Sequence, residues 1–204
     1  MCIRDRSGAT PAGLSCYEPD PQALAEAQRL TRSFSYKPRH GNPPRPIHGL
    51  FLMGSLGTLA QADQSDMDVW VCHAPDLGEN ELAELQKKCQ LLETWAAGQG
   101  AEAHFFLIDP NRFVRGERDT QLSSDDCGTT QHYLLLDEFY RTAIWLAGRT
   151  PLWWLVPVYE ERRYEQYIDT LLSKRFVPAE ENLDLGHMAR TAVSYTHLTL
   201  PTKA

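Results

Sequence analysis

Two aspartates one residue apart are the first candidates for chemistry in this 204-residue sequence. Asp66 and Asp68 lie in the run SDMDVWV, and because Asp is a poor strand former, its presence in an apolar strand needs a reason. Alternate residues of a strand point to one side, so the two carboxylates lie side by side with Trp70. Like charges at that spacing repel unless a cation lies between them, and Mg²⁺ prefers oxygen ligands. The spacing therefore predicts a divalent-cation site.

A Gly-Ser pair precedes this acidic strand. Gly54 and Ser55 directly follow the apolar run GLFLM. Glycine lets the backbone approach a ligand closely, and a serine at a helix N-terminus offers a hydroxyl beside unpaired N–H groups, which favours phosphate. We expect a short helix over 56–61 with Ser55 as its N-cap. A cation site beside a phosphate-binding turn is the equipment of two-metal phosphoryl transfer.

The two motifs together are more specific than either alone. A lone Asp-x-Asp is more often an edge-strand or loop feature, and a lone Gly-Ser pair is weaker still. The combined pattern is hydrophobic-Gly-Ser, ten residues, then Asp-hydrophobic-Asp-hydrophobic. This pattern resembles the signature of the polymerase-beta-like nucleotidyltransferases.

Longer blocks carry a closer resemblance. MGSLGTLAQADQSDMDVWVCH, LQKKCQLLETWAA, FFLIDPNRF and DDCGTTQHYLLLDEFYRTAIWLAG resemble the catalytic region of the gammaproteobacterial class I adenylate cyclases. The resemblance implies conversion of ATP into 3′,5′-cyclic AMP and pyrophosphate by attack of the ribose 3′-hydroxyl on the α-phosphate. It also implies that Asp66 and Asp68 hold two Mg²⁺ ions, and that Gly54 and Ser55 grip the β- and γ-phosphates. The family's large C-terminal regulatory region, through which a regulatory protein would act, is missing.

A third carboxylate usually completes such sites from a neighbouring strand. We assign Glu102 to this role, the alternative being a solvated charge at the end of a strand. Asp109 is the competitor, but an Asp directly before Pro110 is typical of a helix N-cap. Trp70 shares the side of the acidic pair and would stack on adenine or ribose, unless it is a core tryptophan.

Other polar residues have structural explanations. Lys87 and Lys88 fit the solvated face of an amphipathic helix, and Arg141 fits an i, i+4 ion pair with Asp137. Three histidines show no metal-ligand spacing, and we expect each to be structural: His73, His104 and His132.

The hydrophobic periodicity predicts elements that position these residues. Helices are expected over 21–33, 79–97, 131–148 and 160–174, and strands over 48–53, 67–73 and 101–109. We predict an α+β protein with a polymerase-beta-like nucleotidyltransferase fold, in which a small, mixed, twisted sheet has flanking helices. Its parts are an N-terminal helix and connector (7–46), a catalytic core (47–130) and a helical segment that closes the cleft (131–192).

Composition excludes several classes of protein. A net charge of −7 argues against general nucleic-acid binding, although not against an anionic ligand that arrives with metal ions. The five cysteines form no CxxC pair, which favours a reduced, intracellular chain. We find no signal peptide and no apolar run long enough to span a membrane, so we expect a cytoplasmic protein.

The two ends look foreign to the rest of the sequence. MCIRDR and SYTHLTLPTKA resemble translated adapter or assembly artefacts, so we exclude 1–6 and 193–204 from reasoning about the fold. We expect the chain to be an internal piece of a longer protein.

Two rival functions remain open. One is a nucleotidyltransferase that moves a nucleotide to a protein, sugar or RNA acceptor, and the other is a non-catalytic nucleotide-binding module. The intact acidic pair and Gly-Ser turn argue against the second. Only the family resemblance separates the first from a cyclase.

Overall fold

The structure is a computed structural model that describes residues 10–32, 34–36, 44–54, 65–117 and 128–188. Ser55, the helix expected over 56–61 and both foreign-looking ends lie outside these residues. Within the described part of the chain, no helix is both long and apolar enough to cross a membrane.

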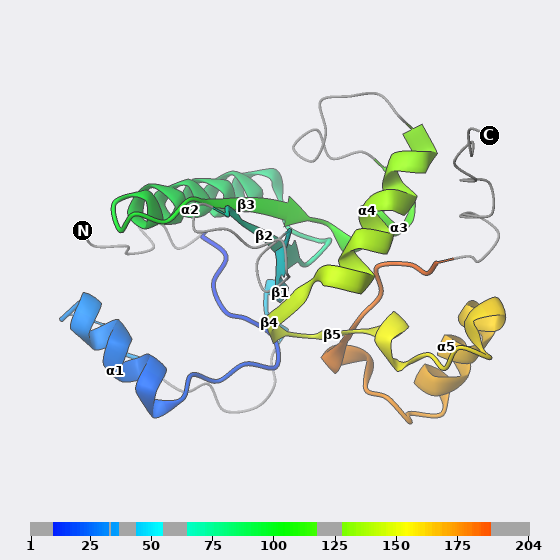
Figure 1. Cartoon of the computed structure of the whole chain (residues 1–204). Coiled ribbons are helices and arrows are strands. Elements are labelled where there is room, and N and C mark those ends of the chain that lie inside the picture. Colours follow the sequence, from blue (N-terminus) through cyan, green and yellow to red (C-terminus); the bar gives the residue numbers. More distant parts are fainter. Residues whose placement is uncertain (1–9, 33, 37–43, 55–64, 118–127, 189–204) are drawn as a thin grey trace, which may run out of the picture.

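A four-stranded sheet lies at the centre of the structure (Figure 1). Its strands are β1 (Ile47–Met53), β2 (Met67–His73), β3 (Ala103–Ile108) and β4 (Ile144–Gly148), in the order β3-β2-β1-β4. Strand β1 pairs antiparallel with β2 and β4, whereas β2 pairs parallel with β3. The expected α+β class with a small mixed sheet is therefore confirmed.

Helix α2 (Glu79–Ala97) makes the crossover that two neighbouring parallel strands require. Its bounds match the prediction, and its first turn is closed by Glu81, whose carboxylate accepts the N–H of Gly78 at 3.0 Å. Helix α2 buries Leu85 and Cys89 against one side of the sheet, where they form a core with Ile47, Val69, Val71 and Leu107.

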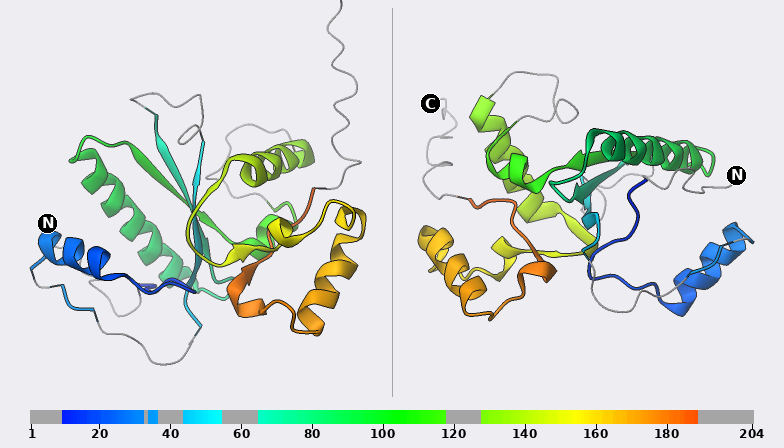
Figure 2. Two further views of the ribbon diagram at one scale, coloured as in Figure 1. Left: turned by 60° about the horizontal axis from the view of Figure 1, so that its bottom comes forward. Right: turned by 180° about the vertical axis from the view of Figure 1, so that it is seen from behind.

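The opposite side of the sheet is covered by α3 (Pro110–Val114) and α4 (Gly128–Thr142). The left view of Figure 2 shows α2 and α4 on opposite sides of the sheet. The second core is aromatic: the indole of Trp70 stacks on Phe139 with ring centroids 5.2 Å apart, and meets Phe113 edge-on at 5.3 Å. Its other buried members include Phe51, Cys72, Ile108 and Leu136.

The helix expected over 131–148 is wrong at its C-terminal end. Helix α4 ends at Thr142, and the next residues form β4, which supplies the open edge of β1 with hydrogen-bonding partners. Ile144 and Trp145 favour a strand because β-branched and aromatic side chains fit a pleated surface. Gly148 has φ +104°, and a Cβ there would lie 2.5 Å from the carbonyl oxygen of His48. This glycine permits close strand contact and does not stop a helix.

The C-terminal part mixes helices with short strands. Helix α5 (Tyr164–Ser173) lies within the expected range 160–174. Strands β5 (Thr150–Pro151) and β6 (Asn182–Leu183) form a separate parallel pair. Three 3₁₀ helices are also present: Leu152–Leu155, Glu161–Arg163 and Ala179–Glu181. The segment 131–192 is thus not purely helical, and the division of the chain into three parts stays a prediction.

Helix α1 (Pro21–Leu30) lies apart from the sheet in Figures 1 and 2. Its predicted N-cap is confirmed, since the carboxylate of Asp20 accepts the N–H of Ala23 at 2.7 Å. The helix ends slightly before the expected residue 33, and none of its residues is buried.

Candidate cation site at the start of strands β2 and β3

The parallel pairing of β2 with β3 sets the positions of the acidic side chains. Asp68 is the register partner of His104. One step earlier, the N–H of Met67 donates to the carbonyl oxygen of Glu102 at 2.9 Å, which places Asp66 beside Glu102 just before the strands begin. Because alternate residues share one side of a strand, all four side chains lie on the same side of the sheet.

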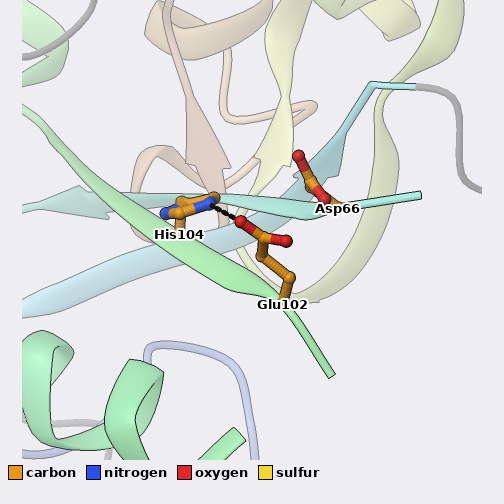
Figure 3. Close-up of side chains that lie close together, drawn as sticks. All are labelled: Asp66, Glu102 and His104. Atoms are coloured by element: carbon orange, nitrogen blue, oxygen red, sulfur yellow. Dashed lines mark ion pairs between the residues drawn. The ribbon is translucent and has the colours of Figure 1, made fainter. Parts of the chain in front are cut away.

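Three of these side chains converge on one point. Asp66, Glu102 and His104 each offer a ligand atom, and these atoms all lie within 4.8 Å of one another. The Nε2 atom of His104 is 3.4 Å from Oε1 of Glu102 (Figure 3). All three residues are exposed, so the group is accessible from solvent.

The separations within this group suit a divalent cation. An octahedral ion with ligand bonds of about 2.1 Å has neighbouring ligand atoms about 3.0 Å apart and opposite ones about 4.2 Å apart. The upper limit of 4.8 Å on the separations between the three ligand atoms lies close to this range. Two carboxylates also supply the hard oxygens that such an ion requires. The residues present therefore fit a divalent cation.

Asp68 lies beside this group in a less exposed position. Burial raises the pKa of its carboxyl above the ordinary value, while His104 lowers that pKa and the Asp66 carboxylate raises it. The net upward shift means that the surroundings disfavour the charged form of Asp68. A cation bound nearby would reverse that balance.

Gly54 brings backbone close to the acidic pair. It directly follows β1, whose last residue Met53 is the register partner of Asp68. Its φ of +91° is a conformation that glycine adopts without strain, and a Cβ built there would lie 3.8 Å from Oδ2 of Asp68. Gly54 therefore lies close to Asp68, as expected. Ser55 lies outside the described residues.

An open cavity of about 500 Å³ borders the site between the end of α2 and the start of β3. Glu102 and His104 form part of its lining, together with Glu93 and Thr94 from α2. The Glu93 carboxylate also accepts the N–H of Phe105 at 2.9 Å. This hydrogen bond ties the outer edge of β3 to α2 beside the site.

The structure gives Trp70 the core role and not the nucleotide-stacking role. Its side chain is 2 % exposed and enclosed by aromatic rings, so the indole has no face left for adenine or ribose. The alternatives foreseen for two other residues are confirmed. Asp109 caps α3 by accepting the N–H of Asn111 at 2.9 Å, and Arg141 pairs with Asp137 at 2.6 Å.

His104 is the residue of the site that the sequence analysis missed. A structural role is expected for His73, His104 and His132, and it agrees with the structure for two of them: His73 is buried, and His132 packs on Phe113 with ring centroids 4.9 Å apart. His104 is instead exposed beside Glu102. The alternation Glu-x-His was visible in the sequence, but only the register of β2 against β3 places it beside the aspartates.

Comparison with known proteins identifies the family. The family described as adenylate cyclase NT domain matches residues 6–154, and the chain therefore belongs to it. The protein named adenylate cyclase of Proteus mirabilis is 44% identical over 181 residues, which cover 88% of this chain and 21% of that protein. The adenylate cyclase of Escherichia coli (strain K12) is 45% identical over 192 residues, which cover 89% of this chain and 22% of that protein. The adenylate cyclase of Yersinia intermedia is 50% identical over 144 residues, which cover 71% of this chain and 17% of that protein. The chain thus spans about a fifth of the length of these curated relatives.

Proposed function

We propose that this chain belongs to the catalytic region of a class I adenylate cyclase, which converts ATP into 3′,5′-cyclic AMP and pyrophosphate. The observation that carries the proposal is the convergence of Asp66 and Glu102 beside Asp68 and the backbone of Gly54. The names of relatives that are 44% to 50% identical support the cyclase over other chemistry. We further propose that the mixed sheet is that of a polymerase-beta-like nucleotidyltransferase fold.

Each part of the site has a proposed task. Asp66, Asp68 and Glu102 hold the divalent cations, which we propose to be two Mg²⁺ ions. Gly54 and Ser55 bind the β- and γ-phosphates, since a glycine with positive φ exposes its backbone to an anion. Bound cations would offset the charge of the triphosphate and favour loss of the 3′-hydroxyl proton.

The proposed reaction is a displacement at phosphorus within one substrate molecule. The ribose 3′-oxygen forms a bond to the α-phosphorus, and its proton passes to solvent. The bond from the α-phosphorus to the oxygen bridging to the β-phosphate breaks, and pyrophosphate leaves with that electron pair. Because the nucleophile is part of the substrate, the protein has to orient one molecule and needs no acceptor pocket.

The setting of the enzyme is also a proposal. We propose a cytoplasmic enzyme that takes ATP and, given its net charge of −7, has no nucleic-acid partner. A regulatory protein would act through the large part of the relatives that this chain does not match. Nucleotide transfer to a protein, sugar or RNA acceptor would use the same acids, but the names of the relatives do not favour it.

Product analysis tests the proposal. The 204-residue chain is assayed with ATP and Mg²⁺, alongside a chimaera in which its matched region replaces that of the Escherichia coli relative. We expect cyclic AMP and pyrophosphate in equal amounts from the chimaera, and their loss in its Asp66→Asn variant. A folded chimaera that binds ATP but releases AMP, or wild-type turnover in the Asp66→Asn variant, would overturn the proposal.

A further inference from the structure

His104 differs in chemistry from the other members of the cation site. Asp66 and Glu102 offer carboxylate oxygens, whereas His104 offers the Nε2 nitrogen of an imidazole within the same 4.8 Å group. Carboxylates suit Mg²⁺ and Mn²⁺ alike, but an imidazole nitrogen suits transition-metal ions better than Mg²⁺. The ligand set on these strands is therefore mixed, and its nitrogen is the feature that discriminates between metals.

The fold holds His104 in place from both edges of its strand. On the inner edge, β3 pairs with β2 in a register that sets His104 opposite Asp68. On the outer edge, the N–H of the following residue, Phe105, donates to Glu93 of α2. The His104 side chain is 47% exposed, and its Nε2 atom lies 3.4 Å from Oε1 of Glu102. A cation reaching Glu102 from solvent would therefore meet this nitrogen.

We infer that His104 is a ligand of the cation held by Asp66 and Glu102, and that its nitrogen makes this position bind Mn²⁺ more tightly than Mg²⁺. The inference rests on the proposed function, because it takes Asp66 and Glu102 as cation ligands. Binding would replace the present contact between His104 and Glu102 by one contact from each to the cation.

A competing role for His104 is to orient Glu102 without touching the cation. The variant His104→Gln separates the two roles. Glutamine keeps a side-chain N–H that can donate to Glu102, but it removes the imidazole nitrogen. A positioning role survives this change, whereas ligation through nitrogen does not, because the glutamine amide can offer a cation only its carbonyl oxygen.

The test uses the 204-residue chain with Mn²⁺ or Mg²⁺ alone as the probe. Free Mn²⁺ is followed by electron paramagnetic resonance, Mg²⁺ binding by calorimetry, and nitrogen ligation by the ¹⁴N modulation in pulsed spectra of the Mn²⁺-loaded chain. We expect ¹⁴N modulation in the wild type. We expect His104→Gln to abolish it and to weaken Mn²⁺ binding, while Mg²⁺ binding stays within error, because only the transition-metal ion gains from the imidazole nitrogen.

The control is His48→Gln, because His48 lies in β1 next to Ile47, which pairs with the last residue of β2 at the far end of the sheet. This variant should bind Mn²⁺ like the wild type. Persistent ¹⁴N modulation or unchanged Mn²⁺ affinity in His104→Gln would overturn the inference, as would an equal loss of both metals.

A second variant separates failure of this inference from failure of the proposed function. Asp66→Asn should weaken the binding of both metals. If it binds both like the wild type, the proposed cation site is wrong and the inference falls with it. If Asp66→Asn loses both metals while His104→Gln changes nothing, the cation site stands and only the role of His104 is wrong.

Discussion

Asp68 and His104 are register partners in the parallel pair formed by β2 and β3. Residues distant in sequence are thereby placed side by side at the start of two strands, on the side of the sheet that also holds Trp70. Helix α2 makes this possible, because it carries the chain across the sheet so that β3 starts beside the start of β2. The candidate site is thus a product of strand register.

Loss of either aspartate should remove turnover and leave the fold intact. We expect Asp66→Asn and Asp68→Asn in the chimaera to lower cyclic AMP formation by about a hundredfold or more, the scale of losing one preorganised electrostatic group. Burial raises the pKa of Asp68, so its charge is unfavourable in the folded state and its removal should not lower the thermal unfolding midpoint.

The control for these variants is Asp169→Asn on the exposed surface of α5, which should behave as the wild type in both assays. Asp68→Asn protein that unfolds at a markedly lower temperature than the wild type would contradict the account of this carboxyl.

Gly54→Ala should separate the cost of backbone strain from the loss of phosphate binding. A side chain at positive φ costs about 1–2 kcal/mol of stability, and Gly116, with φ +65°, should show the same cost when changed to alanine. Only Gly54→Ala should also raise the Michaelis constant for ATP, because only Gly54 lies beside Asp68. Similar Michaelis constants in the two variants, measured in the chimaera, would place the phosphate-binding turn elsewhere.

His48 should make the stability of the fold sensitive to acid. Burial, helped by Arg149 and His73, lowers the pKa of His48 from 6.5 to about 4. As the pH falls through this window, the unfolded chain binds the proton and the folded chain does not, so stability is lost from pH 6.5 down to about 4. Urea unfolding at about pH 7 and about pH 4.5 should show a smaller loss in His48→Gln than in the wild type. Parallel losses in both proteins would show that His48 titrates normally.

Phe139 should be the key residue of the aromatic core. Its side chain is fully buried and packs on the rings of Phe51 and Trp70, with ring centroids 5.0 and 5.2 Å apart. We expect Phe139→Ala to lower the free energy of unfolding by about 3–5 kcal/mol. The matched substitution Phe176→Ala, at a side chain that is 69% exposed, should change it by less than about 0.5 kcal/mol. Equal effects in chemical denaturation would contradict the packing of α4 on the sheet.

The sequence predicts a helix or strand well where interactions between residues close in sequence determine it. The bounds of β2 and α2 and the N-caps Asp20 and Asp109 follow from periodicity and capping chemistry. The change from α4 to β4 did not follow, because an apolar run fits a helix as readily as a strand. The open edge of β1, a tertiary feature, decides between them.

The proximity of the candidate site residues could be predicted in part, for the same reason. Asp66, Asp68 and Gly54 belong to one local motif, and the structure keeps them together. Trp70 lies on the same side of β2 as Asp66 and Asp68, as the alternation of side chains along a strand requires. At the position of Trp70, two residues after Asp68, helix α4 covers this side of the sheet and buries the indole. His104 joins the acids only through strand pairing, which no local pattern encodes.

The most direct test of the proposed cyclisation is the reaction of the chimaera with 3′-deoxy-ATP. This analogue keeps the triphosphate that Gly54, Ser55 and the cations are proposed to bind, but it lacks the oxygen that attacks the α-phosphorus. We predict that it competes with ATP for binding and releases no pyrophosphate, while ATP yields cyclic AMP and pyrophosphate in equal amounts. Release of pyrophosphate from 3′-deoxy-ATP as fast as from ATP would contradict cyclisation and indicate transfer to another acceptor.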